Sequence, residues 1–196
     1  MNQLEKNAHL FTDPHFNHPR LVEKGLRTAG YEELVAESWR TRVQPQDRVY
    51  CLGDVCMKAE ASAHDKFVKP MPGYKILIRG NHDKQRDTWY LSHGWDEVHD
   101  SLLLTTTVNG RHTRVLLSHA PTPDEGNKWD INVHGHFHND AHRANEPANL
   151  AIYTTKHRLL ALECVGYELI SFVDFLEGRI EQRGLWRQSK EAEIAC

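Results

Sequence analysis

Short apolar runs alternate with helical stretches in the first half of the chain. The runs cover residues 8–12, 47–52 and 74–78. Between them, residues 19–44 and 59–69 carry apolar positions at helical spacing. This strand–helix–strand–helix–strand order predicts a parallel sheet. Ligands of such sheets bind beyond the carboxyl ends of the strands.

The pattern changes in the second half of the chain. Residues 98–108 and 111–117 look like strands, and Asn109-Gly110 lies between them. Asn-Gly between two such runs predicts a β-hairpin. Residues 131–134 form another short apolar run, which predicts a further strand.

The last part of the chain gives weaker signals. Residues 159–165 fit one more strand, and Ser171 fits the capping position of a short helix. The segment after Gly178 is polar with mixed charges, and its pattern predicts no element.

Composition indicates one globular domain spanning residues 1–196, with 39% hydrophobic and 26% charged residues. The net charge of −3 argues against a broad nucleic-acid-binding surface. We expect neither a signal peptide nor a membrane span, because no long apolar run occurs. Four cysteines are scattered along the chain, which fits a cytoplasmic protein in a reducing compartment: Cys51, Cys56, Cys164 and Cys196.

Five short clusters of metal-seeking residues stand where apolar runs give way to loops. They are Asp13-Pro14-His15, Gly53-Asp54, Gly80-Asn81-His82-Asp83, Ser118-His119 and Gly135-His136-Phe137-His138. Each cluster alone would also fit an ordinary turn or the polar face of a strand. Together they supply carboxylates, imidazoles and an amide carbonyl, which suit a site for two divalent metals. Residues two apart in an extended segment point the same way, so Asp13 and His15 can share one ion.

In this order the clusters resemble the signature of the calcineurin-like metallophosphoesterases: D-x-H, G-D, G-N-H-[D/E], a lone His and G-H-x-H. The first cluster continues into Phe16-Asn17-His18 and is similar to the D-x-H-F-x-H of small bacterial and phage members. The resemblance covers the chain from about residue 8 to residue 177. It implies an α/β fold in which a two-sheet β sandwich is flanked by helices (α/β/β/α). The site would lie at the carboxyl ends of the strands.

The resemblance implies two divalent metal ions bridged by one carboxylate, that of Asp54. Mn²⁺ is the first expectation, and Fe, Zn²⁺ and Ni²⁺ also suit this donor mixture. The ligands implied for the first ion are Asp13, His15, Asp54 and His138. Those implied for the second ion are Asp54, Asn81, His119 and His136.

Several residues beyond the ligands receive roles from the resemblance or from their position. His82 would be the catalytic residue and give a proton to the leaving oxygen. Asn17 and His18 are candidates for contact with substrate. A second Asp that follows G-D in some members, and would orient His82, is absent here. We expect Asp83 to brace its loop and His134 to have a structural role.

These features predict a dinuclear-metal-dependent phosphoester hydrolase acting by attack of a metal-bridged hydroxide. A phosphodiesterase for a small nucleotide or cyclic phosphate is favoured, because the chain is too short for an added recognition domain. A phosphomonoesterase on the same site is the first alternative. A non-catalytic binding module of the same fold is the second, and the intact set of eight residues argues against it. The native substrate and the oligomeric state stay open.

Overall fold

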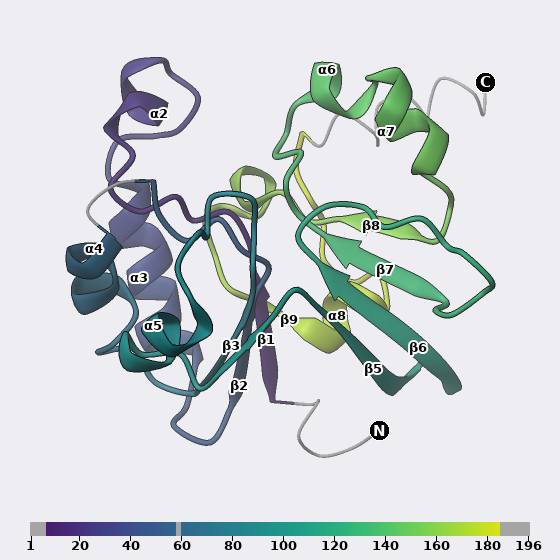
Figure 1. Ribbon diagram of the computed structural model, residues 1–196, viewed down its shortest axis with the longest axis horizontal. Helices are drawn as coiled ribbons and strands as arrows, with labels where there is room; N and C mark the ends of the chain where they lie inside the picture. The colour runs from purple at the N-terminus through teal and green to yellow at the C-terminus, as the bar shows by residue number, and fades with distance from the viewer. Residues whose placement is uncertain (1–6, 58–59, 185–196) are drawn as a thin grey trace.

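A computed structural model describes residues 7–57 and 60–184 of the protein. The strands form two sheets that lie face to face, with helices at their sides and at one end (Figure 1). The strands are β1 (Ala8–Phe11), β2 (Arg48–Cys51), β3 (Tyr74–Ile78), β4 (Glu97–His99), β5 (Ser101–Val108), β6 (Arg111–Ser118), β7 (Ile131–His134), β8 (His157–Leu159) and β9 (Ile170–Ser171). The helices are α2 (Pro19–Glu23), α3 (Tyr31–Arg42), α4 (Glu60–Phe67), α5 (Asp87–Ser92), α6 (Ala141–Ala144), α7 (Pro147–Ile152) and α8 (Phe172–Leu176), with a 3₁₀ turn, η1, at Leu162–Val165.

The first sheet has the strand order β4-β3-β2-β1-β9. Its first four strands are parallel, and β9 pairs antiparallel with β1. The second sheet has the order β5-β6-β7-β8, in which β5 and β6 are antiparallel and the other pairs are parallel. The predicted parallel sheet of the first half is confirmed.

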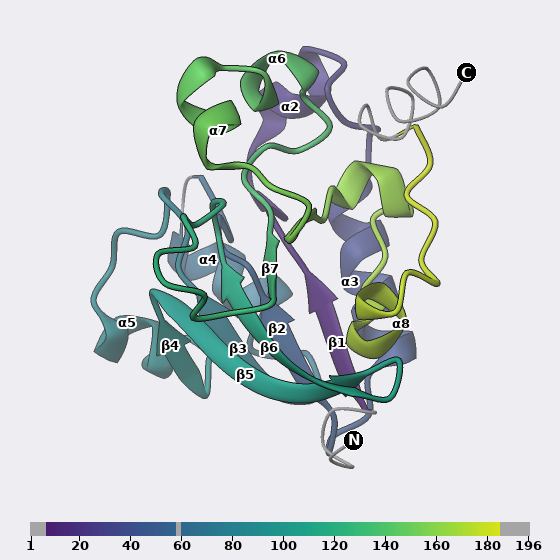
Figure 2. The same cartoon turned by 90° about the vertical axis from the view of Figure 1, so that its right-hand side faces the viewer.

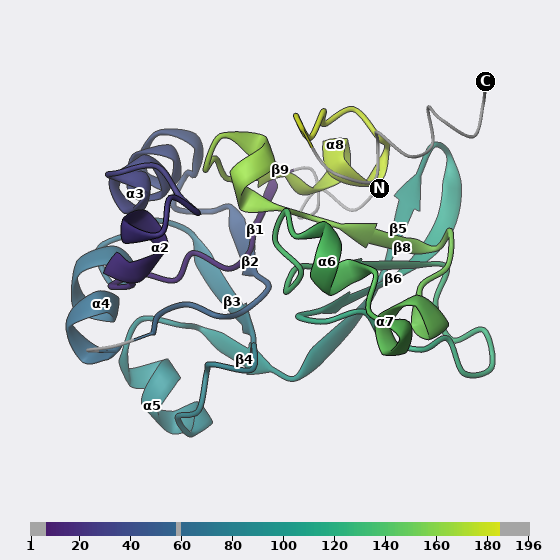
Figure 3. The same ribbon diagram turned by 90° about the horizontal axis from the view of Figure 1, so that it is seen from above.

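Strands of the first sheet are apolar on both faces, as expected of a sheet that is covered on both sides. Along β2, for example, Val49 and Cys51 face the helices, whereas Tyr50 faces the second sheet. Helices α3, α4 and α5 cover the outer face of this sheet (Figure 3). Residues from both sheets meet in the layer between them, including Leu10, Tyr50, Leu52, Ile76, Ile78, Val115, Leu117, Ile131 and Val133.

The second sheet is covered less completely on its outer face. Helices α6 and α7 are short and lie at one end of that sheet rather than across it (Figure 2). On β5, Leu103 points outward and is 52% exposed. The protein is therefore a mixed α/β structure of two sheets with flanking helices, and the helical cover of the second sheet is limited. No helix in the described part of the chain is long and apolar enough to cross a membrane.

Three predicted elements need correction. The helix predicted over residues 19–44 is two helices, α2 and α3, separated by a turn in which Gly25 and Gly30 have positive φ angles. The strand predicted over residues 98–108 is divided at Asp100 into β4 and β5, which belong to different sheets. The strand predicted over residues 159–165 is wrong beyond Leu159, because η1 follows.

Two further predictions from the sequence are confirmed, and four short elements were not predicted. The hairpin at Asn109-Gly110 is confirmed, with positive φ at both residues. Ser171 caps α8, since its hydroxyl accepts the N–H of Asp174 at 3.3 Å. Helices α5, α6 and α7 and strand β9 are too short to show a period, and the sequence did not predict them. Residue 59 and residues 185–196, which include Cys196, lie outside the described residues.

The layer between the sheets predicts a contrast between two leucines of the β5–β6 hairpin. Leu117→Ala removes a fully buried side chain and should lower the free energy of unfolding by about 2–5 kcal/mol. Leu103→Ala, on the exposed outer face, should change it by less than about 0.5 kcal/mol. Urea unfolding of both variants is the measurement. Similar losses for the two would contradict the assignment of the inner face.

Candidate metal centre

The five clusters converge because their strands end at the same side of the two sheets. Asp13 follows β1, Asp54 follows β2 and Asn81 follows β3 in the first sheet. His119 follows β6, and His136 and His138 follow β7 in the second sheet. The loops after these strands therefore face one another across the top of the sandwich in Figure 1.

One group of side chains consists of Asp13, His15 and His138. The Nε2 atoms of His15 and His138 lie 3.3 Å apart. Asp13 Oδ1 is 3.8 Å from the first nitrogen and 3.6 Å from the second. Three donor atoms thus point at one small volume, and Asp13 Oδ1 is buried without a hydrogen-bond partner among the described residues.

A second group consists of Asp54, His119 and His136, with Asn81 beside it. His119 Nε2 lies 3.0 Å from His136 Nδ1, 3.0 Å from the amide oxygen of Asn81 and 3.4 Å from Asp54 Oδ2. His119 Nδ1 contacts the carbonyl of Leu52 at 2.7 Å, which directs Nε2 toward the group.

One oxygen atom stands between the two groups. Asp54 Oδ2 lies 3.7 Å from His15 Nε2 and 3.4 Å from His119 Nε2. The other oxygen, Oδ1, accepts the backbone N–H of His82 at 2.8 Å, which fixes the carboxylate. The donor sets fit two divalent cations sharing this oxygen, because uncompensated ring nitrogens and a buried carboxylate oxygen otherwise face one another.

Backbone strain is concentrated at the same residues. Five of the predicted ligands have left-handed φ values, which non-glycine residues seldom adopt. These residues and angles are Asp13 (49°), His15 (46°), Asp54 (54°), His136 (67°) and His138 (50°). Such conformations cost of order 1–3 kcal/mol each, so the surrounding structure must hold them in place.

The motif glycines allow the loops to touch. A Cβ on Gly53 would lie 2.3 Å from the backbone nitrogen of Gly80, and one on Gly80 would lie 2.1 Å from Asp54 Oδ1. A Cβ on Gly135 would lie 2.3 Å from Asp13 Oδ2. Each glycine is required by close approach to a residue of the site.

Burial and mutual charge set the protonation of the site. Burial alone would raise the pKa of Asp13 and of Asp54, but the histidines facing them hold both values below the ordinary range. Burial lowers the pKa of His15 to about 2 and that of His136 to about 4. Burial also opposes charge on His119, yet its hydrogen bond to Asp54 and the charge of Asp13 raise its pKa to about 9. A cation would therefore displace a proton from His119.

A buried ion pair supports the first group, and sequence reasoning missed it. Arg27 donates to Glu163 from Nε at 2.9 Å and from Nη2 at 2.7 Å. It also donates to the carbonyls of Asp13 and Pro14 at 2.7 and 2.9 Å. Glu163 Oε1 lies 3.1 Å from His138 Nδ1, so the carboxylate orients the ring with Nε2 toward the group. The two residues are 136 positions apart, and no local pattern marks either of them.

Asp83 and His134 have the bracing and structural positions expected of them. The Asp83 carboxylate accepts the N–H groups of Asp54 at 2.7 Å and of Gly80 at 2.8 Å, and so ties two loops together. Burial raises its pKa. His134 is fully buried and contacts the carbonyl of Gly135 and the hydroxyl of Tyr153.

The other residues predicted for the site, His82, His18 and Asn17, lie at different distances from the two groups. The His82 side chain is 41% exposed, and its Nε2 lies 3.8 Å from Asp54 Oδ2, so Asp54 is the carboxylate that faces this ring. The His18 ring lies 5.9 Å from that of His15. The Asn17 amide is turned instead toward Ser62 at 3.4 Å, and the structure does not bring it to the two groups.

Comparison with known proteins finds relatives without a named activity. The gene 66 protein of Mycobacterium phage L5 is 29% identical over 160 residues, which are 67% of this chain and 77% of that protein. The gene 66 protein of phage D29 is 28% identical over 156 residues, 67% of this chain and 78% of its own length. The uncharacterized protein MJ1445 of Methanocaldococcus jannaschii is 32% identical over 84 residues, 40% of this chain and 48% of that protein.

A solved structure supports the fold. The protein of unknown function AQ665 from Aquifex aeolicus superposes with a TM-score of 0.58 and 24% identity, covering 83% of this chain and 94% of its own. No protein-family profile matches the chain. The chain therefore shares its fold with a protein of unknown function.

The buried ion pair predicts a large difference between two glutamates that each pair with an arginine. Glu163→Gln leaves the buried Arg27 guanidinium without its counter-charge and should cost about 3 kcal/mol of unfolding free energy. Glu168→Gln, which breaks the exposed pair with Arg42, should cost less than about 1 kcal/mol. Chemical denaturation in the presence of a chelator measures both. Equal costs would show that Glu163 does not hold Arg27 as described.

Proposed function

We propose that the protein is a dinuclear-metal-dependent phosphoester hydrolase of the metallophosphoesterase fold. One observation carries the proposal: Asp54 Oδ2 stands between the group of Asp13, His15 and His138 and the group of His119 and His136. A carboxylate oxygen shared by two nitrogen-rich donor sets suits a pair of cations about 3.5–4 Å apart. The conjunction of this shared oxygen with all five motif clusters supports the family assignment.

The ions would be divalent, and Mn²⁺ is our first choice, with Fe, Zn²⁺ and Ni²⁺ as the other metals that imidazole and oxygen donors suit. When bound, they would polarise the phosphoryl oxygens and make a coordinated water acidic enough to serve as the nucleophile near neutral pH. The protein's part is to hold the donors in place. The hydrogen bonds of Asp83 and the pair Arg27–Glu163 do this from outside the two groups.

His82 would protonate the leaving oxygen. Its backbone N–H donates to Asp54 Oδ1, while its side chain remains 41% exposed and its Nε2 lies 3.8 Å from Asp54 Oδ2. A group with this placement can reach a substrate without being a ligand of either cation. The favoured substrate class is a small phosphodiester, such as a nucleotide or cyclic phosphate.

Metal dependence is the first test. Protein loaded with Mn²⁺ should contain about two ions per chain and hydrolyse bis(p-nitrophenyl) phosphate, and exhaustive chelation should abolish the activity. Asp54→Asn should lose both ions, because an amide lacks the charge that holds two cations close. Asp87→Asn, at an exposed carboxylate away from the site, is the control and should retain both ions. Normal metal content in Asp54→Asn would remove the bridging role.

The role of His82 predicts a dependence on the leaving group. His82→Ala should slow hydrolysis of an ester with an alkyl leaving group by about 10²–10⁴-fold. The loss should be much smaller with p-nitrophenolate, which leaves without a proton. Metal content, measured in the same samples, should stay at the wild-type level. An equal loss on both substrates, or loss of a metal, would exclude His82 as the proton donor.

A further inference from the structure

A hollow of about 430 Å³ adjoins the candidate metal centre. Its wall includes Leu21, Leu26, Arg27, His138, Arg143 and Glu163. His138 belongs both to this wall and to the first donor group, so the hollow lies directly beside that group. Its volume falls in the range of ordinary small-ligand pockets.

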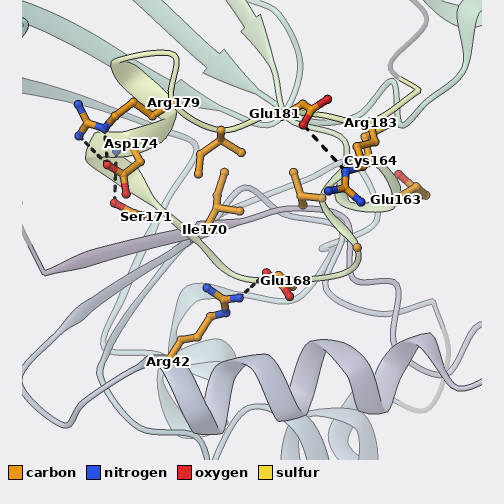
Figure 4. A pocket seen from close by; sticks show the side chains of 13 residues that line it. Arg42, Glu163, Cys164, Glu168, Ile170, Ser171, Asp174, Arg179, Glu181 and Arg183 are labelled. Atoms are coloured by element: carbon orange, nitrogen blue, oxygen red, sulfur yellow. Dashed lines mark hydrogen bonds and ion pairs between the residues drawn. The ribbon is translucent and has the colours of Figure 1, made fainter.

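A larger hollow of about 540 Å³ elsewhere on the protein does not have this relation to the centre (Figure 4). Its charged side chains pair with one another, Arg42 with Glu168 and Arg179 with Asp174. Glu163 lies at its edge, but no residue of the two donor groups lines it. We therefore assign no ligand to it.

Several polar groups in the wall of the smaller hollow have partners within the protein, whereas Glu163 Oε2 is buried without a hydrogen-bond partner among the described residues. The guanidinium group of Arg27 donates to Glu163 and to two backbone carbonyls. The carboxylate of Asp140 accepts the backbone N–H groups of His142 and Arg143. The amide of Asn139 donates to the carbonyl of Gly184 at 3.1 Å. These hydrogen bonds fix several of the polar side chains that a ligand in this hollow would meet.

Two leucines supply the apolar part of the wall. Leu26 is 62% exposed, the largest value among the exposed large hydrophobic residues of the described chain, and Leu21 lies beside it in the wall. A single exposed leucine is ordinary. Two leucines in a hollow beside a reaction centre offer an apolar surface for a flat organic group. Arg143 adds a positive charge to the wall. Its Nη1 donates to the carbonyl of His136 at 2.8 Å, so this charge lies next to the second donor group.

The position of His82 indicates which part of the substrate fits here. His82 is absent from the wall of the hollow, so a leaving group beside His82 would lie outside it. The hollow would then receive the substituent that stays on phosphorus. We propose that this pocket binds that retained substituent, and that it is a nucleoside, whose flat base would lie against Leu21 and Leu26. The inference rests on the proposed function and specifies phosphodiesters over monoesters, which have no retained substituent.

Two substrates with the same leaving group test this proposal. They are the p-nitrophenyl ester of thymidine 5′-monophosphate and methyl p-nitrophenyl phosphate. Wild-type protein with Mn²⁺ should show a higher kcat/KM for the nucleoside ester. Leu26→Asp should reduce that preference about tenfold or more, because it puts a charge in the apolar wall. Leu34→Asp, at a 47% exposed leucine of α3 outside the pocket, should keep it.

The outcomes separate the two proposals. Hydrolysis of neither ester by metal-loaded wild-type protein would overturn the proposed function. Hydrolysis of both without a preference, or with a preference that Leu26→Asp leaves unchanged, would overturn the pocket and leave the hydrolase. An equal loss on both esters would also overturn it, since Leu26 would then act on the centre and not on the retained group.

Discussion

The backbones of the loops after β2 and β3 touch, and the rest of the centre depends on that contact. Gly53 and Gly80 permit it because neither position has room for a side-chain carbon. The contact brings the Asp83 carboxylate within reach of the N–H groups of Asp54 and Gly80. The hydrogen bond from the Asp54 N–H to Asp83 fixes the backbone of Asp54. The Oδ2 atom of Asp54 then faces histidines of both groups. A larger residue at either glycine would separate the loops and displace the oxygen that the groups share.

Charge and strain add to this constraint. The buried carboxylates and the neutral histidines His15 and His136 already have the protonation states that metal ligands need. Five of the predicted ligand residues also have left-handed backbone conformations. Strain at so many donor positions persists only where neighbours over-determine it, and here hydrogen bonds such as those from Arg27 to the carbonyls of Asp13 and Pro14 do so. These hydrogen bonds hold the residues of the candidate site in place without a cation.

Sequence patterns predicted which residues the structure brings together, because each of them follows a buried strand. Asp54 after Gly53 and His136 after Gly135 are local signals that can be recognised in the sequence without knowledge of the fold. Arg27 and Glu163 could not be found in this way, since a buried ion pair between distant residues leaves no period or spacing. The division at Asp100 was hidden for a related reason. Strand-like residues continue on both sides of it, and only the packing of the two sheets assigns β4 and β5 to different partners.

Strand β9, late in the chain, forms the edge of the first sheet beside β1. β9 pairs with β1, and Glu163 just before it holds Arg27 and His138 (Figure 1). During synthesis, residues 8–27 therefore leave the ribosome long before the segment that secures them. The first donor group can reach its final geometry only after residues 163–171 have emerged. Such a long-range closure gives the fold a high contact order and places the assembly of this part of the centre among the late steps of folding.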